Sequence, residues 1–219
     1  MEQAEILKIF KQNNALLVGH FLLSSGLHSD SYLQAALVLQ EPDTALLLGG
    51  ELANRFRGEG ISVVVGPALG GVVLAFAVAC GLEGSRAIFA ERQNGLFCLR
   101  RGFEIRKGER VLVVEDVITT GGSVREVIAM VKSFQAEVCA VAAVAERSSQ
   151  PVDLGVRKEV LLRLSLTTFP PADCLLCRQQ IPLVKPGSRT FKTEQKDAPQ
   201  RSQRTQRDMK QENKTLNKV

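Results

Sequence analysis

Apolar runs that suit buried strands alternate along the chain with segments of helical periodicity. The four apolar residues of 111–114 suit a strand that is buried on both faces. After Ser123, apolar residues recur at 124, 127, 128 and 131, the spacing of one helix face. The same patterns predict helices near residues 2–14, 43–57, 70–80 and 122–135, and strands at residues 61–66, 86–90, 110–115, 137–145 and 160–166. This alternation predicts an α/β fold with a mainly parallel sheet flanked by helices.

The segment "VLVVEDVITTGGSV" (111–124) joins one of these strands to the next helix. In an open parallel sheet, ligands bind where such crossovers leave the carboxyl ends of the strands. Backbone amides of a Gly-rich turn at a helix N-terminus bind anions, and Thr119, Thr120 and Ser123 add hydroxyl donors. Gly121 and Gly122 let the backbone approach a ligand closely. Because neither G-x-x-x-x-G-K-[ST] nor G-x-G-x-x-G occurs, the segment predicts a monophosphate site.

Glu115 and Asp116 stand directly before this phosphate loop. Carboxylates repel phosphate oxygens, so we expect this pair to face proton donors or a cation. A ribose 5-phosphate meets both requirements, since its phosphate binds the loop while its 2- and 3-hydroxyls reach the carboxylates, with a divalent cation nearby.

With these features the segment 111–124 resembles the phosphoribosyl-diphosphate (PRPP) signature of the type I phosphoribosyltransferases. Four other segments resemble the orotate phosphoribosyltransferases in particular. They are similar to the base-covering N-terminal hood (20–42), the diphosphate loop "GPALGG" (66–71), the flexible catalytic loop (89–103) and the orotate-side strand end (144–156) of that family. The resemblance covers residues 1–188 and implies a type I phosphoribosyltransferase-like fold with a small N-terminal hood, about residues 1–42.

The resemblance implies transfer of ribose 5-phosphate from Mg-PRPP to orotate, in pyrimidine nucleotide biosynthesis. It implies Mg²⁺ as cofactor, held mainly by PRPP oxygens rather than by protein ligands. It also implies a homodimer in which the lid, residues 92–104, serves the neighbouring subunit's site. The catalytic residues it implies are Glu115, Asp116, Arg92 and Arg101. The PRPP-binding residues are Arg92, Glu115, Asp116, Val117, Ile118, Thr119, Thr120, Gly121, Gly122 and Ser123, and the orotate-binding residues are Thr119 and Arg147.

Arg147 follows the strand predicted at 137–145 and should therefore lie at the same sheet edge as the phosphate loop. A planar guanidinium suits two parallel hydrogen bonds to the orotate carboxylate. The alternative interpretation is a surface ion pair between Arg147 and the adjacent Glu146.

The net charge of +5 comes from the C-terminal tail alone. Residues 1–188 carry equal numbers of basic and acidic side chains, whereas residues 189–219 carry nine basic and four acidic ones. With almost no apolar residues the tail is expected to be disordered, because burial cannot offset the entropy of ordering it. No apolar run is long enough to span a bilayer and no basic-then-apolar signal begins the chain, so we expect a cytoplasmic protein without membrane contact.

Five cysteines in a chain of this class do not indicate a disulfide framework. Cys174 and Cys177 have the spacing of half a zinc site, but no second pair and no neighbouring histidine in the sequence completes it. We interpret them as an incidental pair of thiols, with a metal shared through a dimer partner as the alternative.

Two other functions compete with orotate transfer. A purine phosphoribosyltransferase would share the PRPP loop but would not need the hood or Arg147. A non-catalytic PRPP-sensing regulator would bind nucleic acid through the basic tail, yet no helix-turn-helix precedes the domain.

Overall fold

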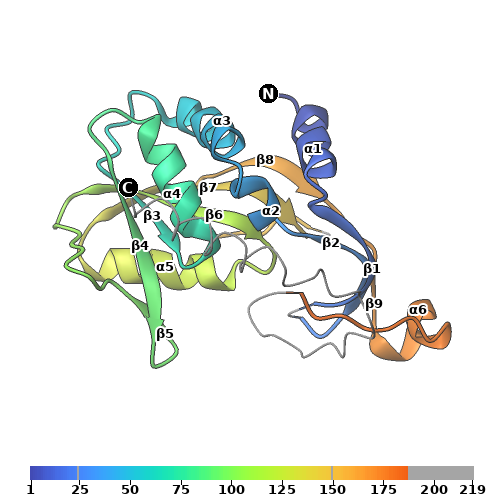
Figure 1. Ribbon diagram of the computed structural model, residues 1–219. Helices are drawn as coiled ribbons and strands as arrows, with labels where there is room; N and C mark the ends of the chain where they lie inside the picture. Colours follow the sequence, from blue (N-terminus) through green and yellow to red (C-terminus); the bar gives the residue numbers. More distant parts are fainter. Residues whose placement is uncertain (24, 149, 187–219) are drawn as a thin grey trace, which may run out of the picture. The chain divides into compact units, whose positions relative to one another are not determined.

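The computed structural model describes residues 1–23, 25–148 and 150–186. Its main sheet has six strands in the order β5-β4-β3-β6-β7-β8, and all neighbours are parallel except β4 and β5. This arrangement confirms the predicted α/β fold with a mainly parallel sheet (Figure 1). The strands are β3 (Val63–Pro67), β4 (Arg86–Gln93), β5 (Leu96–Cys98), β6 (Arg110–Ile118), β7 (Glu137–Arg147) and β8 (Lys158–Leu164).

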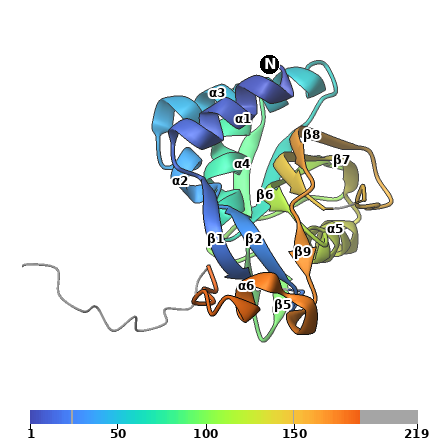
Figure 2. The same cartoon turned by 90° about the vertical axis from the view of Figure 1, so that its right-hand side faces the viewer.

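Helices cover both faces of this sheet (Figures 1 and 2). Along β6, Leu112 and Val114 pack with the helices of one face, whereas Val111 and Val113 pack with α5 on the other. This period of two explains why the strand reads as a continuous apolar run. The first face carries α1 (Gln3–Gln12), α2 (Ala36–Leu39), α3 (Pro42–Ala53) and α4 (Gly70–Cys80), and the second carries α5 (Gly122–Ser133). A 3₁₀ turn, η1 (Asn54–Phe56), extends α3.

The order of the parallel strands places a topological switch point between β3 and β6. The chain goes from β3 to its neighbour β4 on one side and later returns to β6 on the other side of β3. The carboxyl ends of these two strands therefore diverge around a crevice, which is the usual ligand position in an open α/β sheet.

A second sheet of three antiparallel strands lies beside the carboxyl edge of the main sheet (Figure 2), and we call it the hood sheet. Its strands are β1 (Leu16–Leu22), β2 (His28–Leu33) and β9 (Thr168–Phe169), and it is followed by η2 (Pro171–Asp173) and α6 (Leu175–Arg178). The hood is therefore not confined to the first 42 residues, since β9 comes from the end of the described chain. Conversely, Ile6 and Phe10 of α1 belong to the core of the main sheet.

Two elements near the predicted site differ from the sequence-based boundaries. Strand β6 continues to Ile118, so the loop before α5 consists of residues 119–121 only. Part of the expected lid is a β-hairpin, because β4 and β5 are joined by Asn94 and Gly95, both with positive φ. Asn-Gly is the preferred pair in such two-residue turns.

None of the helices in the described segments is both long enough and apolar enough to cross a membrane. The predicted tail, residues 189–219, lies outside the described residues.

Candidate active site

The two adjacent acids lie near the carboxyl end of β6, and Asp116 faces the beginning of α4. Asp116 is so close to Gly70, the first residue of α4, that a Cβ at this glycine would overlap the Asp116 carboxylate. Glycine at position 70 therefore makes room for the acid at the switch point. The loop "GPALGG" therefore lies beside the end of β6, and its Ala68–Leu69 peptide bond is cis.

Burial at the sheet edge raises the pKa of Glu115 well above its usual value, and the charge of Asp116 raises it further. Within the described part of the chain, no Lys or Arg side chain forms an ion pair with either carboxylate. Two neighbouring acids without a cationic partner fit a site that receives a cation together with hydroxyl donors. These residues therefore fit Mg²⁺ carried by a phosphorylated ligand.

The loop of residues 119–121, predicted to bind phosphate, packs against the segment that follows β7. Gly121 has φ 75° and precedes the first turn of α5, whose amides have no partner within the helix. A Cβ at Gly121 would lie 2.7 Å from Val152 and 2.9 Å from Leu154, so a larger residue would displace the 152–154 segment. Arg125 links the same segments, because its guanidinium donates to the carbonyls of Thr120 and Asp153, each at 2.7 Å.

Arg147 ends β7 and lies on the cavity between the hood and the carboxyl edge of the main sheet. This cavity, of about 230 Å³, is lined by Tyr32, Asp116, Thr119, Arg147 and Lys185 among others. Thr119 and Arg147 also line an adjacent hollow of about 200 Å³. The two side chains predicted to bind orotate, and one of the acids, are thus brought together. A larger hollow, of about 640 Å³, lies at the opposite edge of the sheet near residues 56–61 and carries none of the predicted site residues.

The Arg147 guanidinium stacks over the Tyr32 ring at 5.1 Å from its centroid. Burial lowers the pKa of Arg147. Burial also raises the pKa of Tyr32, which the Arg147 charge lowers in part and the Asp116 charge raises. Among the described residues Arg147 has no carboxylate partner. A partly desolvated guanidinium facing a cavity is suited to an anionic ligand.

The alternative ion pair between Arg147 and Glu146 is wrong, because successive strand residues point to opposite faces. The Glu146 carboxylate contacts Lys158 Nζ at 2.5 Å and Arg163 Nε at 3.4 Å, and it accepts a hydrogen bond from the Val152 amide. Burial acts to raise the pKa of Glu146, but hydrogen bonds from Lys158 and Val152 lower it overall. Glu146 thereby fixes the segment that follows β7 and leaves Arg147 free for a ligand.

The two predicted lid arginines do not reach this cavity in the same chain. Arg92 pairs with Glu126 at 2.8 Å and stacks on Phe97 at 4.1 Å, and Arg101 pairs with Glu91 at 2.8 Å. These are partners on the hairpin and on α5, and both arginine side chains are substantially exposed. The structure thus brings Asp116, Thr119 and Arg147 to one cavity, with Glu115 next to Asp116 on β6, but leaves the two arginines apart.

Two features of the fold could not be predicted from the sequence patterns. Lys185 lines the cavity because the segment after α6 returns along β1, where the Leu22 amide donates to the Val184 carbonyl. His20 and His28 lie beside Cys174 and Cys177, although no histidine is near the cysteines in the sequence. We found no local signal for either feature, because the partners are far apart in the sequence.

Comparison with known proteins decides the family. A family model described as "Phosphoribosyl transferase domain" matches residues 38–162. The orotate phosphoribosyltransferase of Pelotomaculum thermopropionicum is 56% identical over 189 residues, which is 86% of this chain and 99% of that protein. The orotate phosphoribosyltransferase of Caldicellulosiruptor bescii is 55% identical, again over 86% of this chain and 99% of that protein. The chain belongs to the orotate phosphoribosyltransferase family.

Solved structures agree with this assignment. The crystal structure of orotate phosphoribosyltransferase from Aeropyrum pernix matches with a TM-score of 0.59 and 26% identity, over 73% of this chain and 93% of that one. An orotate phosphoribosyltransferase is a pentosyltransferase, so membership places the chain among the enzymes of pyrimidine nucleotide biosynthesis. The family assignment favours this function over the purine and the regulatory alternatives.

Proposed function

We propose that the chain transfers ribose 5-phosphate from PRPP to orotate, giving orotidine 5-monophosphate and diphosphate. The observation that carries this proposal is Arg147, a partly buried guanidinium without a carboxylate partner among the described residues, on a cavity shared with Asp116. Orotate differs from uracil by one carboxylate, and Arg147 is placed to bind that group. A purine base has no carboxylate to meet it.

Different residues around the cavity bind different parts of the two substrates. The amides and hydroxyls of residues 119–123 bind the 5-phosphate. Glu115 and Asp116 accept hydrogen bonds from the ribose hydroxyls and stabilise the positive charge that develops at the anomeric carbon as diphosphate leaves. Arg147 binds the orotate carboxylate, Thr119 contacts both substrates, and Lys185 adds a second positive charge at the base. Mg²⁺, when bound with PRPP, neutralises charge on the leaving diphosphate.

The direct test is release of diphosphate from Mg-PRPP with four acceptor bases, measured with the full chain. We expect turnover with orotate and little or none with uracil, adenine or hypoxanthine, because only orotate supplies the anion that Arg147 binds. Preference for adenine or hypoxanthine would contradict the proposal. Equal rates with uracil and orotate would show that Arg147 does not select the base.

We further propose a homodimer in which Arg92 and Arg101 serve the partner's site. The hairpin of β4 and β5, which carries Arg92 and precedes Arg101, projects from the sheet edge (Figure 1), and neither arginine lines the cavity of its own chain. Apolar side chains on the adjacent helices α3 and α4 remain exposed in a single chain, notably Leu47 at 51% and Phe76 at 63%. Exposed apolar side chains of this kind are typical of protein interfaces.

This arrangement predicts complementation between two inactive variants. In a mixed dimer of Arg92→Ala/Arg101→Ala with Asp116→Asn, one of the two sites has a complete set of residues, so mixing should restore part of the activity. Exchange between differently tagged wild-type subunits provides the control. If subunits exchange and no activity returns, the shared site is wrong.

A further inference from the structure

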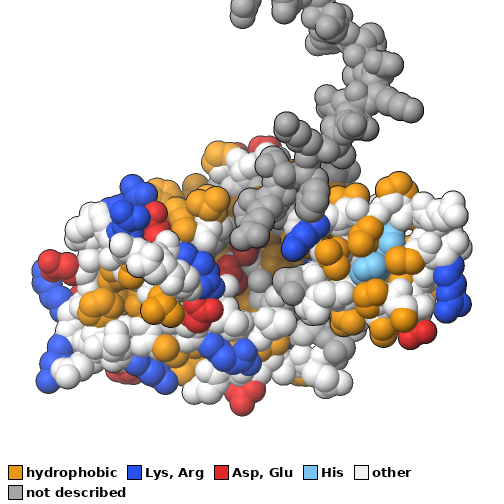
Figure 3. All heavy atoms as spheres, turned by 90° about the horizontal axis from the view of Figure 1, so that it is seen from below, with side chains coloured by type: hydrophobic (Ala, Val, Ile, Leu, Met, Phe, Trp, Pro, Cys, Tyr) orange, Lys and Arg blue, Asp and Glu red, His pale blue; other side chains and the backbone are white. Residues whose placement is uncertain are grey.

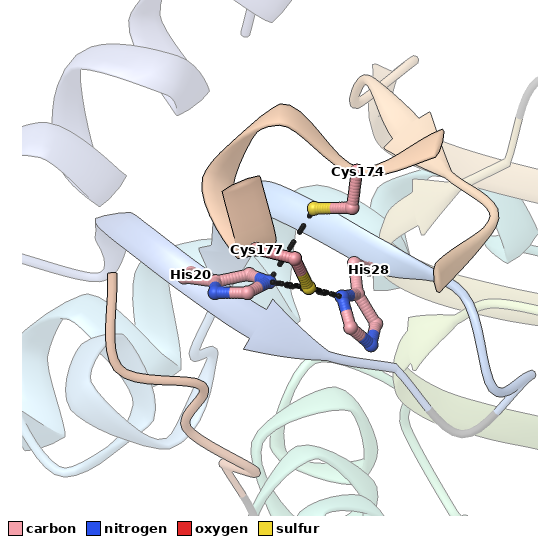
Figure 4. Close-up of side chains that lie close together, drawn as sticks. All are labelled: His20, His28, Cys174 and Cys177. Atoms are coloured by element: carbon pink, nitrogen blue, oxygen red, sulfur yellow. Dashed lines mark hydrogen bonds between the residues drawn. The ribbon is translucent and has the colours of Figure 1, made fainter. Parts of the chain in front are cut away.

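Four side chains with metal-binding atoms converge on the outer side of the hood. His20 lies on β1, His28 begins β2, and Cys174 and Cys177 belong to the N-terminal cap and the first turn of α6 (Figure 4). One donor atom from each lies within 4.8 Å of the other three. In the space-filling view the histidines reach the surface within a ring of hydrophobic side chains (Figure 3).

The spacing of these atoms is that of a tetrahedral metal site. With Zn–N bonds near 2.0 Å and Zn–S bonds near 2.3 Å, the ligand atoms of a tetrahedral zinc site are separated by roughly 3.3–3.8 Å. Here His20 Nε2 lies 2.9 Å from His28 Nδ1, 3.4 Å from Cys174 Sγ and 3.7 Å from Cys177 Sγ. Cys177 Sγ lies 3.3 Å from His28 Nδ1. Three of these four distances lie within that range, and the His20–His28 distance is shorter by about 0.4 Å, so a metal ion requires only a small separation of the two imidazoles.

The orientation of His20 is fixed in the way that metal-binding histidines are fixed. Its Nδ1 lies 2.8 Å from the carbonyl oxygen of Ile181. A carbonyl oxygen can only accept, so Nδ1 carries the proton and the lone pair is on Nε2, which faces the cluster. One lone pair cannot satisfy the three atoms that converge on it by hydrogen bonding alone, whereas a shared cation satisfies all four.

The environment favours a structural site that excludes water. His20, His28 and Cys174 are 3%, 5% and 0% exposed, and Cys177 completes the set from the surface. Four protein ligands leave no open position for a substrate or water. Thiolate with imidazole selects zinc and other soft or borderline metals over Mg²⁺ and Ca²⁺, which prefer oxygen.

The segment that carries the cysteines has little else to hold it. Between residues 171 and 186, Cys174 is the only buried residue. Helix α6 has four residues, too few to be stable without tertiary support. A metal that binds only the folded arrangement supplies that support directly.

We infer that His20, His28, Cys174 and Cys177 bind one structural Zn²⁺ that joins the hood sheet to the C-terminal segment. Beyond α6 this segment runs along β1, where the Val184 amide donates to the His20 carbonyl at 2.8 Å, and Lys185 then enters the cavity wall. The zinc therefore holds one wall of the substrate cavity. This role rests on the proposed function, whereas the binding of zinc does not depend on it.

The first test is the metal content of the full chain, purified without a histidine tag. We expect one zinc ion per chain by elemental mass spectrometry, and close to none in Cys174→Ser/Cys177→Ser. The matched thiol control, Cys80→Ser/Cys98→Ser, should keep its zinc, since neither cysteine lies in the cluster. Wild-type protein that lacks zinc and has reduced thiols would overturn the inference. A wild-type mass lower by two hydrogens, caused by a disulfide between Cys174 and Cys177, would also overturn the inference.

A second measurement stays informative if the double variant does not fold. Wild-type protein loaded with Co²⁺ should show the intense visible d–d bands of a tetrahedral ion together with thiolate-to-metal charge transfer. An octahedral spectrum would overturn the proposed ligand set.

The structural role has its own readout. A zinc-selective chelator should accelerate tryptic cleavage after Arg178 in α6, and added zinc should reverse this. Unchanged cleavage of zinc-free protein would show that the metal does not hold the segment. Because none of these measurements depends on turnover, failure of the zinc site and failure of orotate transfer are distinguishable.

Discussion

Replacing Arg147 by alanine is expected to lower kcat/KM for orotate by roughly thirtyfold or more. Loss of one partner from a desolvated, hydrogen-bonded charge pair costs about 2–5 kcal/mol, and each 1.36 kcal/mol is about tenfold in rate. Arg147 is partly buried and stacked on Tyr32, so water does not readily replace it. The KM for PRPP should stay nearly unchanged, because Arg147 is not among the residues proposed to bind the 5-phosphate.

Arg147→Lys should restore only part of the activity, since an ammonium cannot make two parallel bonds to a carboxylate. Arg163→Ala is the matched control, because Arg163 lies opposite Glu146 on the neighbouring strand and its side chain is largely exposed. Steady-state kinetics with orotate varied at saturating PRPP measures all three variants. Full orotate turnover in Arg147→Ala would refute the assignment of this residue.

Asp116→Asn and Glu115→Gln should each lower kcat by roughly ten- to a thousandfold, the scale of a lost electrostatic contact to the transition state. Both changes keep the shape of the side chain and remove its charge. PRPP binding should survive better than turnover, because the loop that binds the 5-phosphate is untouched. Glu137→Gln removes the same charge from the exposed beginning of β7 and is the control. An unchanged kcat in the double variant would contradict the mechanism.

The raised pKa of Glu115 adds a pH dependence to this prediction. Glu115 must be ionised to accept hydrogen bonds from both ribose hydroxyls, so kcat/KM for PRPP should fall as the pH falls through that raised pKa. The Asp116 charge is one cause of the rise, after burial. Asp116→Asn should therefore move the acidic limb of the profile to lower pH, which a plot of kcat/KM against pH would show. An acidic limb at the same pH would mean that another group titrates.

The main sheet could be predicted because burial on both faces makes its strands apolar runs. Strands β3, β6 and β7 and helices α4 and α5 all lie close to their predicted positions. The hood could not be predicted strand by strand. Strand β2 reads "HSDSYL" and is mostly polar, and β9 has only two residues. Such strands are determined by their pairing partners rather than by their own pattern.

Site residues could be predicted where the local sequence determines their position, and could not be predicted where partners distant in the sequence determine it. Glu115, Asp116 and residues 119–123 are contiguous, and the chemistry of a strand-to-helix crossover is local. Lys185 and the histidines beside Cys174 are brought into place by tertiary pairing alone. A pair of cysteines with zinc spacing predicts half a site, and only the fold supplies the second half.

The pairing of β2 with β9 has a consequence for how the protein is made. His28 pairs with Phe169, so the hood sheet closes only after almost all of the described chain has left the ribosome. The main sheet can form earlier, since its last strand ends at Leu164. A newborn chain that has reached Leu164 therefore holds every strand of the main sheet but not yet the strand that closes the hood sheet.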